Sequence, residues 1–366
     1  MSNKLQLDII TSIKFPLMVG VILIHSTLSD IVVAGNLIDV ESYKVYNVLS
    51  YILSDLYGRL CVPLFFFISG YLFFYNVDDF SIIVYKDKLI KRAKTILVPY
   101  VLWILITLLI YFVAEFILPE LFSGRNKLIA DYSLLDFISC FWDMTLVNPS
   151  ASGHMPLYTP FWYIRDLLVV VLFTPLIYLF LKSKVRYLYI ALLMIAFAFE
   201  LWPISIPGFG ATSFCFFSLG SFFSINKKNF TDFVHKSVWI LFAAYIITLA
   251  LEILLENQAL VVYCANLNKF VGIGLMIYLF AFLLDKNMIK PNKFISSSCF
   301  FLYAYHMIPL TLLKKVFVIL IPTLSNLTLV SIYLICPLLI ISIGILLYYC
   351  LNKFVPTITS VLTGSR

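Results

Sequence analysis

Two basic side chains stand out in the first apolar stretch of the chain, Lys14 and His25 of the run KFPLMVGVILIH. Eleven residue steps separate them, and at about 100° per step they project from one helix face to within about 20°. The helical rise sets them about 16 Å apart along the axis. A lysine can hold an anionic donor by its charge, and an imidazole can act as a general base. The spacing therefore indicates a general base and an anion-binding group on one face of one helix.

The same pair also has a purely structural interpretation. Either group placed in hydrocarbon costs on the order of several kcal/mol, so their shared face is expected to line a polar cavity, with Lys14 near the cytoplasmic boundary and His25 in the outer half of the membrane. Alternatively, Lys14 extends to the interface and His25 bonds to another helix. Pro16 lies between them and can bend the helix, which makes the alignment approximate.

Arg59 precedes the apolar run VPLFFFISGY, residues 62–71. At the outer end of a span it can hold a carboxylate or phosphate of a substrate, or pair structurally with Asp55 four residues earlier. Ser69 and Gly70 allow close helix contact. No GxSxG elbow surrounds Ser69, so we do not predict a serine nucleophile.

The third feature is the basic run KRAKTILVPY, residues 91–100, which begins with Lys91 and Arg92. Cations at the cytoplasmic start of a helix suit the phosphate groups of a donor. They suit topology control and lipid headgroups equally well.

Two further groups lie within later apolar segments. Arg165 and Asp166 are adjacent in FWYIRDLL, residues 161–168. Neighbours on a helix point about 100° apart, so we expect them not to pair simply and at least one to find a partner elsewhere. His306, in YAYHMIP, is expected near the bilayer midplane, either as a hydrogen-bonded structural group or as part of a relay that contacts substrate.

His25 and Asp30 also spell HxxxxD, the catalytic signature of glycerolipid acyltransferases. The motif is short, the downstream blocks of that family are absent, and the pair lies at the outer end of a span. We therefore do not favour that relationship. Asp30 can still orient His25, because a carboxylate fixes the tautomer of an imidazole and raises its basicity.

Composition identifies the elements that must position these groups. Of 366 residues, 62% are hydrophobic and 12% charged, with a mean hydropathy of +1.00. A soluble fold cannot bury this much apolar surface, whereas lipid can cover it. We predict an all-α polytopic membrane protein with about ten transmembrane helices, at residues 9–28, 50–75, 96–118, 160–181, 187–203, 209–225, 237–255, 269–284, 296–315 and 327–351.

The distribution of charge predicts the orientation. The two chain ends and the loops 76–95, 182–186, 226–236 and 285–293 carry most of the 26 lysines and arginines. The positive-inside rule places that side, with both termini, in the cytoplasm. Lys314 and Lys315 are assigned to the opposite side. The net charge of +7 is thus a topology signal, and no nucleic-acid partner is expected.

The rest of the chain predicts little additional chemistry. The seven cysteines form no CxxC pair and lie mostly in apolar runs, so we expect neither a metal site nor a disulfide framework. The first helix reads as a retained span rather than a signal peptide. Residues 119–159 form a long extracytoplasmic loop. A single transmembrane domain, 1–366, is expected, without an appended soluble domain.

In this order, the motifs resemble the acyltransferase 3 family of integral membrane O-acyltransferases. Lys14 and His25 look like its first-helix motif, RLCVPLFFFISGYLF like its second-helix block and KRAKTILVPY like its cytoplasmic basic motif. FWYIRDLLVVVLFTPLI is similar to its Trp-Phe-x-Arg block and FFLYAYHMIPL to its late Tyr-x-x-His block. The resemblance spans nearly the whole chain.

The resemblance implies ten core helices and transfer of an acyl group, often acetyl, from cytoplasmic acyl-CoA. The acceptor is usually a hydroxyl of a surface glycan or of its lipid-linked precursor. His25 would be the essential histidine, with Lys14, Lys91 and Arg92 at the donor site. Arg59, Arg165, His306 and Asp30 are assigned to the acceptor.

Two departures from the family pattern matter. The family often has arginine where Lys14 stands, so a point charge replaces a bidentate grip. The second arginine of the basic motif is replaced by Thr95, beside Lys94. The esterase-like domain fused to some members is also missing, so transfer would end in the membrane domain or on a partner from glycan assembly.

Three functions remain open from the sequence. The first is a cell-membrane O-acyltransferase acting on an extracytoplasmic glycan. The second is a transporter or exporter of glycan or small solute that uses the same intramembrane cavity. The third is a structural subunit of a polysaccharide synthase. Lys14, His25 and Arg92 together provide a donor grip and a base, which favours the enzyme.

Overall fold

The computed structural model describes residues 3–29, 31–33, 36–117, 127–148, 153–255, 258–321 and 324–365. Within these ranges the regular secondary structure is helical apart from one antiparallel pair of two-residue strands, β1 (Val32–Val33) and β2 (Asn36–Leu37). The helices are α1 (Asn3–Ile24), α2 (Lys44–Ser50), α3 (Cys61–Phe74), α4 (Ile82–Arg92), α5 (Val98–Ile117), α6 (Leu134–Ser139), α7 (Trp162–Leu172), α8 (Thr174–Lys182), α9 (Arg186–Ala198), α10 (Ala211–Ile225), α11 (Phe230–Leu254), α12 (Val261–Asp285), α13 (Lys293–Tyr305), α14 (Met307–Leu320), α15 (Asn326–Phe354) and α16 (Pro356–Thr363).

Each of the ten predicted spans coincides with helical structure, but the helices differ in length. Six segments are long and apolar enough to cross a membrane, and among them α2 with α3 and α4 with α5 are continuous through short π-helical and 3-10 turns. Two more are bent pairs, α7 with α8 at 60° and α13 with α14 at 66°. Helices α9 and α10, with 13 and 15 residues, are shorter than a bilayer core of about 30 Å. The helical membrane fold is therefore confirmed, whereas ten crossings and the sides of the termini stay predictions.

Contacts between loops divide them between two ends of the molecule. At one end, Gln6 accepts a hydrogen bond from the Phe230 amide at 3.3 Å, and Lys227 pairs with Asp78 at 2.5 Å. At the other end, Tyr43 donates to the Leu324 carbonyl at 3.3 Å, and Asn326 accepts from the amide of Val45 at 3.0 Å. The loops that charge assigned to one side of the membrane therefore meet each other, as an alternating topology requires.

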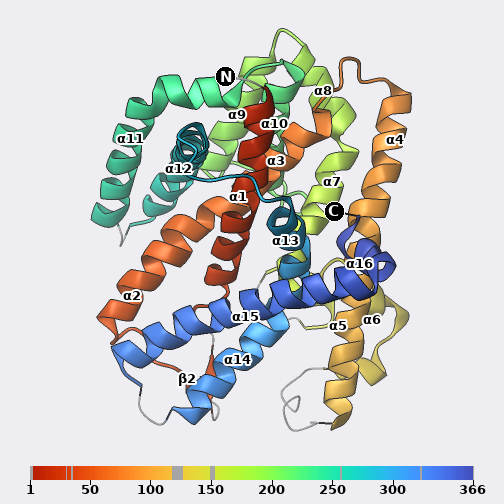
Figure 1. Ribbon diagram of the computed structural model, residues 1–366, viewed down its shortest axis with the longest axis vertical. Coiled ribbons are helices and arrows are strands. Elements are labelled where there is room, and N and C mark those ends of the chain that lie inside the picture. Colours follow the sequence, from red (N-terminus) through yellow and green to blue (C-terminus); the bar gives the residue numbers. More distant parts are fainter. Residues whose placement is uncertain are drawn as a thin grey trace.

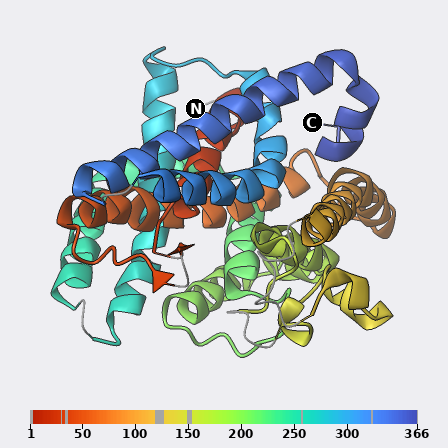
Figure 2. The same ribbon diagram turned by 90° about the horizontal axis from the view of Figure 1, so that it is seen from below.

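Figure 1 shows α1 running down the centre of the molecule, with α11 and α12 at one flank and α4 with α5 at the other. The long helix α15 crosses the lower half of Figure 1 and the upper half of Figure 2, and it leads to α16 beside α5. The Trp103 indole of α5 donates to the Leu362 carbonyl of α16 at 3.0 Å. A central α1 is thereby surrounded by the elements that carry the other motifs.

A close helix crossing joins α3 and α10 and depends on two glycines. A Cβ added to Gly70 would lie 2.0 Å from the Phe217 carbonyl oxygen, and one added to Gly220 would lie 1.9 Å from that of Phe67. Small residues let helix backbones approach in this way in membranes. This crossing confirms that Gly70 serves close helix contact, and it fixes α3 against the body of the protein.

Lys314, which the charge pattern assigned to the side of the membrane opposite the termini, is not a surface cation. The residue lies in α14, is 1% exposed and donates to backbone carbonyls at the end of α1. The neighbouring Lys315 is exposed. Hydropathy could not separate the two, because a lysine is buried only when a distant segment supplies acceptors for it.

Candidate functional site

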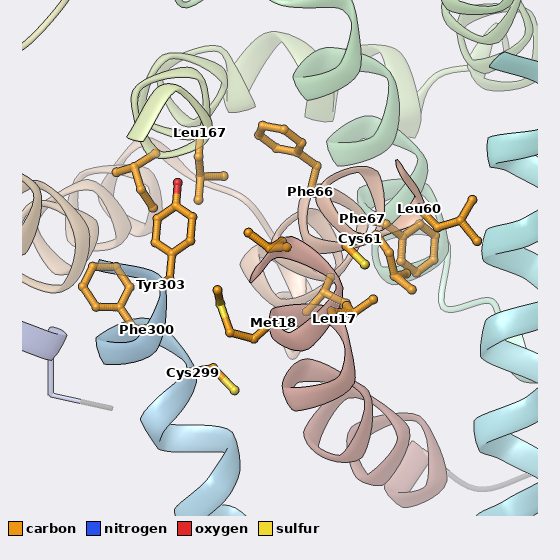
Figure 3. Close-up of a cluster of buried hydrophobic side chains, with 14 of the residues drawn as sticks. Leu17, Met18, Leu60, Cys61, Phe66, Phe67, Leu167, Cys299, Phe300 and Tyr303 are labelled. Carbon is orange, nitrogen blue, oxygen red and sulfur yellow. The ribbon is translucent and has the colours of Figure 1, made fainter. Parts of the chain in front are cut away.

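The inner face of α1 lines a cavity of about 170 Å³. Lys14, Met18 and Val21, spaced by four and three residues, form its wall on this helix. Figure 3 shows Met18 facing Cys299, Phe300 and Tyr303 of α13. The stripe on which the sequence placed Lys14 therefore faces the protein interior.

His25 continues that stripe one step beyond the cavity lining. It lies in the turn that follows Ile24, and its amide still bonds to the Val21 carbonyl at 3.4 Å. Its ring lies beside that of the fully buried His306, with centroids 5.4 Å apart and planes tilted by 42°. Lys14 and His25 thus both point inward, and the two histidines singled out by the sequence meet.

Helix α4 brings the basic motif to the same cavity. Arg92, the last residue of α4, lines the cavity, and its guanidinium carbon lies 5.7 Å from the centroid of the Phe73 ring. Lys91 is exposed and is not part of the lining. Among the described lining residues two are cationic and none is a carboxylate, so the cavity favours an anion. The sequence had grouped Lys91 with Arg92, but only Arg92 reaches this cavity.

His306 occupies the break between α13 and α14. Its Nδ1 lies 2.8 Å from the Tyr303 carbonyl and 3.2 Å from that of Leu302, so it carries the proton and donates. Its buried Nε2, which then has a free lone pair, has no hydrogen-bond partner among the described residues. Pro309 lacks the amide that would continue the helical ladder and so accounts for the bend. The result is an acceptor nitrogen held in place beside His25.

Four polar residues of the cavity wall were not predicted as site residues, although the sequence had singled out Ser69 for helix contact: Ser69, Tyr163, Ser296 and Tyr303. The hydroxyls of Ser69 and Tyr163 lie 3.2 Å apart, which ties α3 to α7. Tyr303 donates to the carbonyl of Pro160. Tyr163 precedes Arg165 by two residues, and helical periodicity places these two on different faces. The motif had drawn attention to the charged residue rather than to the tyrosine on the cavity side.

Arg59 does not use Asp55 as its local partner. Its guanidinium makes two hydrogen bonds to Glu252 of α11, at 2.5 and 2.9 Å, and one to Asn268 of α12, at 2.9 Å. The two charged side chains are 13% and 9% exposed. The arginine is absent from the lining of the cavity of Lys14. Arg59 therefore links the start of α3 to the pair of helices α11 and α12 and is not available to a substrate in the cavity of Lys14.

Arg165 and Asp166 do pair, contrary to the expectation from helix geometry. The Nε and Nη2 atoms of Arg165 lie 3.0 and 2.9 Å from one oxygen of Asp166, because the long guanidinium side chain folds back over its own helix turn. The Nη1 atom donates to the carbonyls of Trp142 and His154 at 2.8 and 2.7 Å. The part of the expectation that required a partner on another segment is correct. The pair anchors the backbone at Trp142 and at His154 to α7.

One predicted site residue, and the expectation of no metal site, still have to be placed against the structure. Asp30 lies outside the described residues. Across the described part of the chain, no three His, Cys, Asp or Glu side chains come together as ligands for a metal ion.

Comparison with known families is consistent with this geometry. The acyltransferase 3 family model, an acyltransferase domain, matches residues 8–349. The chain belongs to this family. No curated protein and no solved structure matches it. The class defined by fold and family is a membrane acyltransferase.

Proposed function

We propose that this protein transfers an acyl group, acetyl in the first instance, from acyl-CoA to a hydroxyl of an extracytoplasmic or lipid-linked glycan. The observation that carries the proposal is the joint placement of Lys14 and Arg92 in one cavity whose α1 wall leads to His25. The setting is the cytoplasmic membrane, with the chain ends inside. Acyl-CoA would enter from the end of the molecule where α1 and α4 present their cations.

The cavity chemistry suits the donor. Acyl-CoA carries several phosphate charges and an extended arm, and two cations with no carboxylate among the described lining residues attract such a group. The apolar part of the lining, which includes Met18 and Phe300, suits the uncharged arm. The rise from Lys14 to His25, about 16 Å, then separates the anion grip from the reaction.

His25 would act as the general base. It takes the proton of the acceptor hydroxyl, whose oxygen attacks the thioester carbonyl carbon. The tetrahedral intermediate collapses as the carbon–sulfur bond breaks, and the protonated imidazole returns the proton to the leaving thiolate. The ester and free CoA are then the products, with no other reactant needed. In this scheme the free Nε2 lone pair of His306 would accept a hydrogen bond from the glycan substrate.

The test is acyl transfer by purified protein in lipid nanodiscs, with radiolabelled acetyl-CoA and glycan acceptors. His25→Ala should lower transfer by about 10²- to 10⁴-fold, the usual contribution of a general base. His235→Ala is the matched control, since this exposed histidine of α11 lies outside the cavity. Loss of acylation from the glycans of deletion cells, read by mass spectrometry, would identify the group.

A transporter would give a different pattern. Cells that carry His25→Ala would then acylate their glycans normally but fail to export them or a small solute. That result would overturn the enzymatic proposal and establish the alternative.

A further inference from the structure

The turn that carries His25 is held by hydrogen bonds from several segments. Helix α1 ends at Ile24, where the last carbonyls of a helix have no partner in the helix itself. The Ile22 carbonyl accepts from the Ser26 hydroxyl at 2.7 Å, and the Ile24 carbonyl from that of Thr27 at 3.2 Å. Local side chains therefore satisfy part of this helix end.

Distant segments satisfy the rest. The Leu23 carbonyl accepts from the Ser54 hydroxyl at 2.7 Å, and the Leu28 amide donates to the Tyr46 hydroxyl at 2.8 Å. The Lys314 ammonium of α14 donates to the carbonyls of His25 and Thr27, at 2.9 and 2.7 Å. One cation thus bridges the two backbone carbonyls on either side of Ser26.

Burial makes this lysine informative. Lys314 is 1% exposed, although an ammonium in a membrane interior is costly unless it is neutralised or hydrogen-bonded. The C-terminal end of a helix carries partial negative charge, which a cation at that end offsets. The exposed neighbour Lys315 shows that α14 could present a lysine outward. A snorkelling lysine would leave the carbonyls of the turn without a donor.

We infer that Lys314 is a positioning residue: it clamps the C-terminal end of α1 and thereby fixes the backbone of His25 relative to the reacting atoms. The clamp lies on the face of the turn that α14 covers, and the same bent pair of helices carries His306. The same pair of helices, α13 with α14, therefore contacts the backbone of His25 through Lys314 and carries His306. The inference rests on the proposed function insofar as His25 is the base.

The clamp should affect turnover rather than donor binding. The cations proposed to bind the donor, Lys14 and Arg92, are not on α14. Removal of Lys314 should therefore leave the KM for acyl-CoA within about threefold of the wild-type value. A displacement of the base by about 1 Å is enough to lower kcat roughly 100-fold. A lysine that served folding alone would lower stability without this division between kcat and KM.

The experiment compares Lys314→Met, which retains the length of the side chain without its donors, with Lys315→Met as matched control. We expect the first to lower kcat about 10- to 100-fold and to raise amide exchange selectively over residues 25–29. The control should behave as wild type in both measurements. Lys314→Gln, which can still donate, should recover part of kcat and replaces Lys314→Met if that variant does not fold.

Three outcomes would overturn the inference: wild-type kcat in Lys314→Met, unchanged exchange over 25–29, or exchange raised throughout α14 and α15 with kcat lost only in proportion to folded protein. Failure of the proposed function would give a different result: the wild-type protein would transfer no acyl group, or His25→Ala would transfer it as fast as wild type. The exchange measurement decides on the clamp even in that case.

Discussion

The imidazole rings of His25 and His306 lie with their centroids 5.4 Å apart, although one belongs to the turn after the first helix and the other to the break between α13 and α14. Main-chain carbonyls hold His306 with Nδ1 as donor, which leaves Nε2 as a buried acceptor. Two histidines with different constraints therefore lie at one place, and in the proposed function His25 would be the base and His306 a fixed hydrogen-bond acceptor. Neither ring could be assigned this relationship from its own helix.

The first prediction concerns the free nitrogen of His306. In His306→Asn the amide nitrogen can replace Nδ1 as donor to the Tyr303 carbonyl, while nothing replaces Nε2. We expect kcat for acyl transfer to fall by about 10- to 100-fold, as for loss of a hydrogen bond to a reacting group. His306→Gln, which retains an acceptor near Nε2, should be less impaired if it folds. Equal activity of His306→Asn and wild type would show that His306 is structural.

The second prediction separates the cavity cations from the surface cation beside them. Lys14→Met and Arg92→Met should each raise the KM for acyl-CoA by about 10- to 100-fold, because a charged hydrogen bond contributes about 1.5–3 kcal/mol. Lys91→Met is the control and should leave the KM unchanged, since Lys91 is exposed and outside the lining. Similar effects of all three variants would indicate attraction by the basic surface as a whole instead of a donor site.

The third prediction tests the commitment of Arg59 to Glu252. Glu252→Gln leaves a nearly buried guanidinium without its counter-ion and should destabilise the protein by about 3–5 kcal/mol, seen as a lower melting temperature in detergent. The double variant Arg59→Met with Glu252→Met should recover most of that loss. Asp78→Asn, which breaks an exposed pair with Lys227, should change little. If the double variant instead has a changed KM for the glycan acceptor, Arg59 takes part in substrate binding.

The fourth prediction is a pH dependence outside the membrane helices. Hydrogen bonds from Lys127, and then from Ser133, lower the pKa of Asp136 to about 2, below its ordinary value of 3.8. A lowered carboxyl pKa stabilises the folded segment above the ordinary value, and this contribution is lost as the pH falls towards 2. Pepsin should therefore cleave residues 127–139 faster at pH 2 than at pH 4. Asp136→Asn should be cleaved faster at pH 4 and show a weaker dependence, whereas Asp131→Asn should match wild type.

Hydropathy and residue spacing predicted the helices, because helix formation depends on residues that are near one another in the chain. Apolar runs of sufficient length must be helical in lipid, and the ten expected segments all are. The bend at Pro309 was not anticipated, although a proline inside the expected span 296–315 was a usable signal. Helix α9 also ends earlier than expected, at Ala198 instead of residue 203.

For the candidate site, the sequence by itself determined that Lys14 and the residues three and four positions apart along α1 share one face, because helical periodicity fixes that relation. Tertiary structure alone decided the partners: Arg92 without Lys91 at the cavity, Glu252 on Arg59, Asp166 folded against Arg165, and His306 and Lys314 at the end of α1. The physical reason is range. Periodicity and hydropathy act over a few turns, whereas a buried charge takes its partner from whichever distant helix packing brings within hydrogen-bond distance.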